Sequence, residues 1–460
     1  MKLARASTPF FHVRNRCGST AAAALLALIA ASPPALALAP GEDGVRVVVP
    51  ITGLADAAEA VAIDPDGRIV LAGGSSGSSA ALAGLTPAGA LDPSFSGGGV
   101  VIHDLGAGQG DGLHAFVRLD DGRYAGCGAL FGGATAMDFV VARFDSDGAL
   151  DTTFNGSGYA STPFLQSGAG GSLFDQCNAV AVQADGMIVS AGVTYENGPA
   201  SVALTRHTAA GVLDGMFGGD GKVDINASSA ANGNSEAHAL VLQPDGKLLV
   251  AGFAYGNGHN LLLLMRLNTD GTPDQSFGNA GITRTPVGTS EDIANAIVRQ
   301  PDGRIVIAGS AITTDGRRDF VLARYSENGV LDPSFSDGGV VTTQVGPGDD
   351  RAYALALMPW GRLVAAGSAR ISTSAAGTDL ALVAYNADGT LDRYFGDAGM
   401  RMVDVSDFDD IAYGLAADID GQHFWAVGTA SPDATQDFIA VEFGLPDTIF
   451  RHSFDTATAP

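Results

Sequence analysis

Residues 294–344 read ANAIVRQPDGRIVIAGSAITTDGRRDFVLARYSENGVLDPSFSDGGVVTTQ. Four short runs in this stretch are apolar or rich in β-branched residues, and such residues favour strands. The runs lie at 294–300, 304–309, 320–325 and 340–344. A PDG turn at 301–303, a polar loop and an NG turn at 328–329 separate them, as expected for short antiparallel strands. The stretch therefore predicts one four-stranded blade of a β-propeller.

The first turn of this stretch recurs along the whole chain. Its glycines are Gly67, Gly122, Gly186, Gly246, Gly303, Gly361 and Gly421, separated by 55, 64, 60, 57, 58 and 60 residues. A fixed period of this size with strand-like content is typical of a propeller or a solenoid. The seventh copy ends without a fourth strand, whereas the orphan segment 45–51 (VRVVVPI) is similar to the fourth strands of other copies. We therefore predict an all-β fold, a seven-bladed β-propeller of four-stranded antiparallel blades, with the ring closed by the N-terminal strand pairing in the last blade.

A second turn carries the motif G-x-[LP]-D-x-x-F at invariant intervals in six copies. Its aspartates and phenylalanines are Asp92 and Phe95, Asp151 and Phe154, Asp214 and Phe217, Asp274 and Phe277, Asp332 and Phe335, and Asp392 and Phe395. Together with the PDG-[RK]-[IL] turns, the LAG or VAG strand ends and the following GGVV, this motif resembles the delta-60 repeat family over about residues 44–450. The resemblance implies a β-propeller in exported bacterial proteins, and it implies no particular activity.

The composition limits the classes of partner. The chain has 460 residues and a formal net charge of −25. We expect no nucleic-acid partner, because affinity for nucleic acid comes mainly from neutralising phosphates with Lys and Arg. The same reasoning argues against anionic membrane surfaces, whereas an acidic surface suits solubility and cation binding.

The N-terminus predicts export. Residues 1–39 combine a basic segment, an apolar run at 21–31 and small-x-small cleavage sites near 35–39, the pattern of a signal peptide. The alternative is a retained membrane anchor, but the apolar run is shorter than the ~20 residues of a span. We expect the propeller at 40–450, a C-terminal tail at 451–460, no membrane span after signal cleavage, and an extracellular or periplasmic (or outer cell-surface) monomer. Loss of Cys17 with the signal would leave two cysteines, and export permits a disulfide between them.

One aspartate column is the best candidate for a site. Eleven residues before each first-turn glycine lie Asp56, Asp111, Asp175, Ser235, Asp292, Asp350 and Asp410. In the structural interpretation, which we favour because the column recurs in nearly every copy, each carboxylate accepts backbone N–H groups of its own turn or of the neighbouring blade. In the alternative, the six aspartates surround one mouth of the channel and bind a hard cation such as Ca²⁺. No cofactor other than this Ca²⁺ is expected.

Loops carry the remaining signal. If the first turns share one face, the loops after the second and fourth strands share the other, and these loops vary in length and composition. They include residues 73–79, 131–137, 195–200, 226–235, 311–318 and 369–378. Cys127 ends a second strand and Cys177 begins the next inner strand, so both should lie near this face on adjacent blades. We predict that they form a disulfide.

Catalytic motifs are weak. The sequence contains no HExxH, no GxSxG and no phosphate-binding loop. His114 and His238 share one column near the axis and are expected to be structural. We therefore expect a non-catalytic secreted scaffold that binds a protein, polysaccharide or cell-envelope partner through its variable loops. The alternative is a hydrolase or lyase with an active site at the channel mouth, assisted by calcium, for which two suitably spaced carboxylates or an Asp with a His in one pocket would be the evidence.

Overall fold

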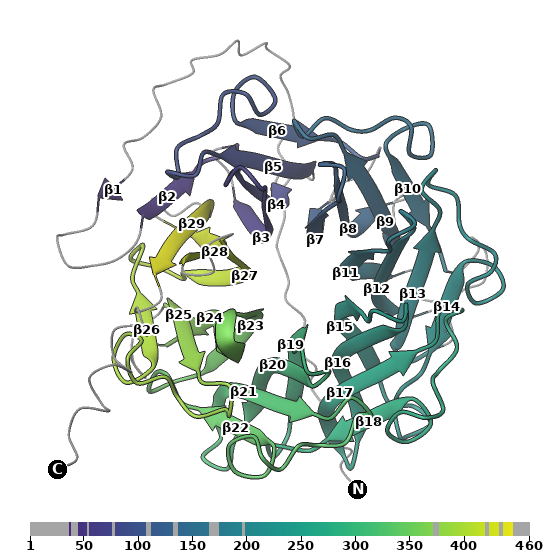
Figure 1. Cartoon of the computed structure of the whole chain (residues 1–460), viewed down its shortest axis with the longest axis vertical. Coiled ribbons are helices and arrows are strands. Elements are labelled where there is room, and N and C mark those ends of the chain that lie inside the picture. Colours follow the sequence, from purple (N-terminus) through teal and green to yellow (C-terminus); the bar gives the residue numbers. More distant parts are fainter. Residues whose placement is uncertain are drawn as a thin grey trace, which may run out of the picture. The chain divides into compact units, whose positions relative to one another are not determined.

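The computed structural model describes residues 36–37, 45–52, 55–75, 79–106, 112–131, 137–164, 174–195, 198–370, 377–418, 423–431 and 436–444. All of them belong to the compact unit formed by residues 35–460. They form seven antiparallel sheets, and Figure 1 shows these sheets arranged as blades around a centre. The predicted all-β, seven-bladed propeller is confirmed.

Each of the first six blades is a four-stranded antiparallel meander whose strands follow one another in sequence. Blade 1 contains β3 (Asp56–Ile63), β4 (Ile69–Ser75), β5 (Ser79–Leu85) and β6 (Val100–His103). Blade 2 contains β7 (Gly112–Arg118), β8 (Tyr124–Phe131), β9 (Met137–Phe144) and β10 (Tyr159–Thr162). Blade 3 contains β11 (Asp175–Val182), β12 (Ile188–Thr194), β13 (Ser201–His207) and β14 (Lys222–Ile225).

The second half of the ring repeats this plan. Blade 4 contains β15 (Ser235–Leu242), β16 (Leu248–Gly256), β17 (His259–Leu267) and β18 (Ile282–Thr285). Blade 5 contains β19 (Asp292–Arg299), β20 (Ile305–Ile312), β21 (Arg318–Tyr325) and β22 (Val340–Thr343). Blade 6 contains β23 (Asp350–Leu357), the 3-10 turn η1 (Pro359–Gly361), β24 (Leu363–Ala369), β25 (Asp379–Tyr385) and β26 (Met400–Val403).

Blade 7 combines strands that are far apart in the sequence. It contains β27 (Ile411–Ala417), β28 (His423–Ala430), β29 (Asp437–Gly444) and β2 (Val45–Val49), with β1 (Leu36–Ala37) at its outer edge. The β2 strand pairs with β29 in antiparallel register, from Arg46 opposite Val441 to Val49 opposite Phe438. The first strand of each blade contacts that of the next, and β27 contacts β3, so the ring is closed as predicted.

Several predicted segments lie wholly or largely outside the described residues. They are Asp111, the turn at 420–421, the degenerate motif at 445–450, the tail at 451–460 and the signal peptide except for 36–37. The domain boundaries therefore stay predictions. Among the described residues, no helix has the length and apolar character needed to cross a bilayer.

The second-turn motif holds neighbouring blades together. The Nε atom of Arg266 on β17 donates to Asp274 at 2.7 Å, and the guanidinium lies 4.5 Å from the centre of the Phe277 ring. The same guanidinium donates to the carbonyl of Glu327 in the next blade at 2.6 Å. Equivalent arginines are Arg143, Arg206 and Arg324. In blades 1 and 6, Gly84 and Ala384 replace this arginine, and Arg68 and Arg362 bind the motif aspartate instead.

Every inner strand also contains a β-bulge. The register shifts at one residue in each, namely Glu59, His114, Asn178, His238, Asn295, Tyr353 and Tyr413. The bulge brings the backbone of the inner strand so close to the second strand that only glycine fits there. At Gly309, for example, a Cβ atom would overlap the carbonyl of Ile293. This close approach explains the repeated Ala-Gly, which lies within the second strands and not at their ends as the sequence suggested.

Candidate functional site

The aspartate column lies at the start of the inner strands. Asp56, Asp175, Asp292 and Asp350 are the first residues of their strands, and Asp410 directly precedes β27. Each of these five residues is at most 4% exposed, so the carboxylates are buried beneath the connecting loops and do not line an open mouth.

The buried carboxylates accept hydrogen bonds from the loop that enters their own strand. Asp292 accepts from the backbone N–H groups of Val287 and Gly288, both at 2.8 Å. Asp56, Asp175, Asp350 and Asp410 are bound in the same way. Ser235, which replaces the aspartate in blade 4, accepts from the N–H of Ala227 at 2.9 Å. These are the bonds that the structural interpretation predicts, while cation binding by the column stays a prediction.

A second aspartate column faces the first across the blade junctions. Asp138, Asp319, Asp379 and Asp437 lie at or near the start of the third strands of their blades, and all four are buried or half-buried. Burial, and to a smaller extent the charge of Asp138, raises the pKa of Asp175. In the same way burial, and then Asp319, raises the pKa of Asp350. These junctions on the variable-loop face therefore hold pairs of carboxylates whose negative charges repel one another.

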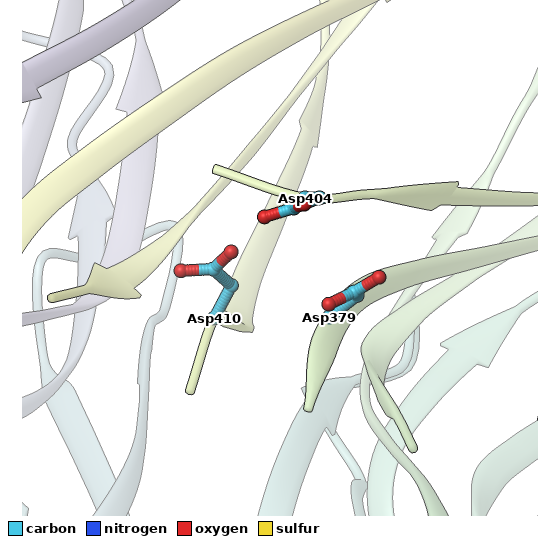
Figure 2. A group of neighbouring side chains, drawn as sticks. All are labelled: Asp379, Asp404 and Asp410. Carbon is cyan, nitrogen blue, oxygen red and sulfur yellow. The ribbon is translucent and has the colours of Figure 1, made fainter. Parts of the chain in front are cut away.

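Three carboxylates meet at the junction between blades 6 and 7. Asp379 begins β25, Asp404 follows β26, and Asp410 precedes β27, and Figure 2 shows the three side chains gathered together. One carboxylate oxygen of each residue lies within 4.8 Å of one carboxylate oxygen of each of the other two. Burial, followed by the charges of Asp404 and Asp410, raises the pKa of Asp379 to about 6. Carboxylates in this arrangement are the oxygen ligands that hard divalent cations prefer.

A polar pocket of about 440 Å³ opens on the same face between blades 4 and 5. One wall is the tip of the β16–β17 hairpin, which turns through Asn257 and Gly258 with positive φ at both residues, 54° and 95°. An Asn-Gly pair is suited to this turn because both positions require positive φ. The other wall is the end of the loop before β19, and Asn260 forms a backbone bridge with Glu291 there. The lining residues are Tyr255, Asn257, Gly258, His259, Asn260, Thr289, Ser290 and Glu291.

His259 connects this pocket to the aspartate column. Its Nε2 atom lies 4.0 Å from Oδ2 of Asp292 and is buried without a hydrogen-bond partner among the described residues. Glu291, the residue before Asp292, forms an ion pair with Arg318. His259 lines the pocket, whereas the Asp292 carboxylate is buried behind it, so the pair meets only in part the arrangement named above as evidence for the enzyme alternative.

The two column histidines near the axis have structural partners. Nδ1 of His114 lies 2.8 Å from the amide nitrogen of Gln176, and Nδ1 of His238 lies 3.0 Å from the amide oxygen of Asn295. The side chains of Asn178 and Asn295 donate to carbonyls of the next inner strand. The bulged residues therefore link blade to blade around the centre.

The predicted disulfide is confirmed. Cys127 on β8 and Cys177 on β11 are bonded, with 5.8 Å between their Cα atoms, and both are fully buried. The bond joins blade 2 to blade 3. Such a bond is suited to an oxidising compartment.

The sequence also matches a known family in five places. Residues 65–95, 120–154, 243–277, 300–335 and 361–395 match the family described as "Domain of unknown function (DUF5122) beta-propeller". All five segments end on the phenylalanine of the second-turn motif. The chain is a β-propeller repeat protein. The narrower resemblance to the delta-60 repeats stays an expectation, and no curated protein matches the sequence.

Several solved structures are similar to this propeller. A Dyadobacter fermentans protein of unknown function is 12% identical, with 87% of this chain and 98% of that chain covered and a TM-score of 0.44. An inactive variant of virginiamycin B lyase from Staphylococcus aureus is 10% identical, with 87% and 100% covered and a TM-score of 0.45. Sqt1 from Chaetomium thermophilum is 14% identical, with 88% and 99% covered and a TM-score of 0.44. At these identities and scores nothing about their activities or ligands carries over to this propeller.

Sequence reasoning found one member of the three-carboxylate cluster and missed two. Asp410 belongs to the predicted column, whereas Asp379 and Asp404 do not. An alignment of the copies on the third strands would have shown the second column, because an aspartate precedes the first apolar residue at 138, 319, 379 and 437. The pocket beside His259 gave no comparable signal, since its two walls come from different blades.

Proposed function

We propose that this propeller is an exported, non-catalytic scaffold that binds a polysaccharide in the pocket between blades 4 and 5. The observation that carries the proposal is the lining of that pocket, which combines one aromatic ring with amide, hydroxyl, imidazole and carboxylate groups. Binding pockets combine apolar surface with a few polar groups that fix the orientation of the ligand. A sugar offers both an apolar ring face and a set of hydroxyl groups, so it suits this lining better than an apolar ligand does.

Each part of the lining has a role in this proposal. Tyr255 provides a ring on which a sugar face stacks, and its hydroxyl group provides a polar edge. Asn257 and Asn260 can both donate and accept hydrogen bonds, whereas the carboxylate of Glu291 only accepts. The ion pair with Arg318 orients Glu291 at the pocket edge. Two walls built by a tight hairpin and a bridged loop hold these groups in place before the ligand arrives, which lowers the entropic cost of binding.

Export is supported by the buried disulfide and by the N-terminal sequence pattern. We propose the same scaffold role where the partner is a protein or a cell-envelope component. We also propose that the propeller is a monomer.

One observation favours the enzyme alternative, a hydrolase or lyase. The imidazole of His259 lies near the pocket and near the buried Asp292, 4.0 Å away. An imidazole oriented by a carboxylate is a common general base. In the scaffold proposal the same pair only shapes the pocket wall.

Binding to a panel of soluble polysaccharides, followed by isothermal titration calorimetry, tests the proposal. Tyr255→Ala should weaken binding at least tenfold, whereas Trp360→Ala, which removes an aromatic ring that is 68% exposed in the first turn of blade 6, should leave it unchanged. Equal loss in both variants, or no binding to any polysaccharide, would contradict the proposed site.

Product analysis distinguishes the enzyme alternative from the non-catalytic scaffold. The intact protein and His259→Gln are incubated with any polysaccharide that binds. New reducing ends, or the ultraviolet absorbance of an unsaturated product, that disappear in the variant would show catalysis. Binding without products supports the scaffold.

A further inference from the structure

The junction between blades 6 and 7 differs from the other junctions. Three positions meet at each junction: the residue before the strand-three core, the residue after strand four and the start of the next inner strand. Between blades 6 and 7 they are Asp379, Asp404 and Asp410. Between blades 5 and 6 they are Asp319, Gln344 and Asp350, and between blades 3 and 4 they are Ser201, Asn226 and Ser235. Among the junctions whose three positions are all described, this one alone has three carboxylates.

Asp379 lacks the partners that a buried carboxylate needs. It is 8% exposed, and no described residue donates a hydrogen bond to it or forms an ion pair with it. Its counterpart Asp319 accepts a hydrogen bond from the hydroxyl group of Thr313 at 3.2 Å. Asp379 instead lies against Asp404 and Asp410 (Figure 2). An ionised carboxylate that is this enclosed and has no donor or counter-charge is destabilising, so the arrangement favours a bound cation or a proton.

We propose that Asp379, Asp404 and Asp410 bind one Ca²⁺ ion that joins blade 6 to blade 7 on the variable-loop face. Oxygens bind Ca²⁺ at about 2.3–2.6 Å, so two ligands on opposite sides of the ion lie about 4.6–5.2 Å apart. The three oxygens, all within 4.8 Å of one another, lie within the span that the ligands of one Ca²⁺ ion occupy. Mg²⁺ demands near-ideal octahedral geometry and is usually bound through only one or two carboxylates, so three carboxylates suit Ca²⁺ better.

The surroundings already hold one of the three ligands in place. Asp410 is fixed by the backbone N–H groups of Val405 and Ser406, at 2.6 and 2.9 Å, so one carboxylate is already oriented. Asp404 lies at the exposed side of the cluster, where water molecules can complete the six to eight oxygens that Ca²⁺ takes. The ion would thereby tie the strand-three start and the crossover loop of blade 6 to the inner strand of blade 7. The proposal does not depend on polysaccharide binding, because the pocket lies at a different junction.

The test uses the intact protein after removal of cations with a chelator. Titration calorimetry with CaCl₂ should show one site per chain, and native mass spectrometry should show the added mass of one calcium. Asp379→Asn should weaken Ca²⁺ binding at least tenfold. Asp319→Asn is the matched control, because it changes the equivalent residue at the junction that has Gln344 in place of Asp404, and it should bind Ca²⁺ as the unchanged protein does.

Thermal unfolding gives a second measurement. Because Ca²⁺ would bind only the folded state, adding it should raise the melting temperature, and this shift should be absent in Asp379→Asn. If Asp379→Asn fails to fold, Asp404→Asn replaces it, since Asp404 is exposed. Absence of stoichiometric binding at millimolar Ca²⁺, unchanged binding in both cluster variants, or equal loss in Asp319→Asn would overturn the proposal.

Discussion

The ring of Phe277 occupies the space that a side chain at Gly329 would need. A Cβ atom at Gly329 would lie 2.5 Å from the ring, and the two residues belong to successive blades. The pairs Phe95 and Gly148, Phe217 and Gly271, and Phe335 and Gly389 show the same relationship. The invariant interval between glycine and phenylalanine in the second-turn motif therefore sets the contact between one blade and the next.

This contact predicts a difference between two glycines with similar backbones. Gly329 has φ 76° and Gly338 has φ 83°, but a Cβ atom at Gly338 would meet nothing within 4 Å. Both alanine variants carry the strain of positive φ, and only Gly329→Ala adds overpacking of about 1–3 kcal/mol. Urea unfolding should show Gly329→Ala to be the less stable variant by this amount. Equal stabilities would mean that the phenylalanine moves aside freely.

Removal of the Arg266 guanidinium should lower the free energy of unfolding. In Arg266→Met the buried Asp274 loses an ion pair, and the Glu327 carbonyl loses its donor. Loss of one partner of a buried ion pair costs about 3–5 kcal/mol of stability. Because Asp274 keeps its ion pair with Lys247 in the variant, we expect a cost at the lower end of this range. The control is Arg317→Met, since Arg317 and Asp315 are 42% and 51% exposed and such a pair contributes about 0–1 kcal/mol. Chemical denaturation of both variants checks the difference.

The disulfide should contribute measurably to stability. Its cysteines are 50 residues apart, and closing a loop of this size stabilises a protein by about 2–4 kcal/mol in the chain-entropy description. The double variant with alanine at Cys127 and Cys177 should therefore unfold at lower denaturant than the oxidised protein. Mass spectrometry without reduction should find no free thiol at either position in exported protein. Two free thiols there would contradict the bond.

His207 should contribute to the loss of folding stability at low pH. Burial lowers its pKa to about 4, and its Nδ1 atom has no hydrogen-bond partner among the described residues. An unfolded histidine has a pKa of about 6.5, so between about pH 6.5 and 4 the unfolded state takes up a proton that the folded state does not. Stability should therefore fall as the pH falls through this window.

The variant His207→Phe should remove this part of the pH dependence, and Phe144 and Phe443 already occupy the equivalent position in blades 2 and 7. Denaturation midpoints at pH 7 and pH 4.5 should differ less in the variant than in the unchanged protein. An identical pH dependence in both proteins would show that His207 does not titrate on unfolding.

Repetition explains which features could be predicted from sequence. The PDG turns, the motif around Asp274 and the orphan segment 45–51 recur or complete a pattern, so the blade number and the ring closure followed from them. The pairing of Cys127 with Cys177 followed from their positions in adjacent copies. The hydrogen bonding of Asp292 followed from its position in a column that recurs in nearly every copy.

The features that sequence reasoning missed depend on contacts between blades. Asp379 meets Asp410 only because the third strand of one blade packs beside the inner strand of the next, across a loop whose length varies between copies. His259 approaches Asp292 for the same reason. The bulge at Asn295 adds an unpaired residue without changing the apolar pattern around it, so no periodicity signals it.

The pairing of β2 with β29 has a consequence for the order of events during synthesis. β2 is synthesised long before its partner β29, and the hydrogen bond from Thr429 to the carbonyl of Asp56 spans 373 positions of the chain. Contacts of such long range form slowly, and until they form the nascent protein carries an unpaired β-edge. Before blade 7 is complete, this edge is therefore exposed to association with neighbouring chains.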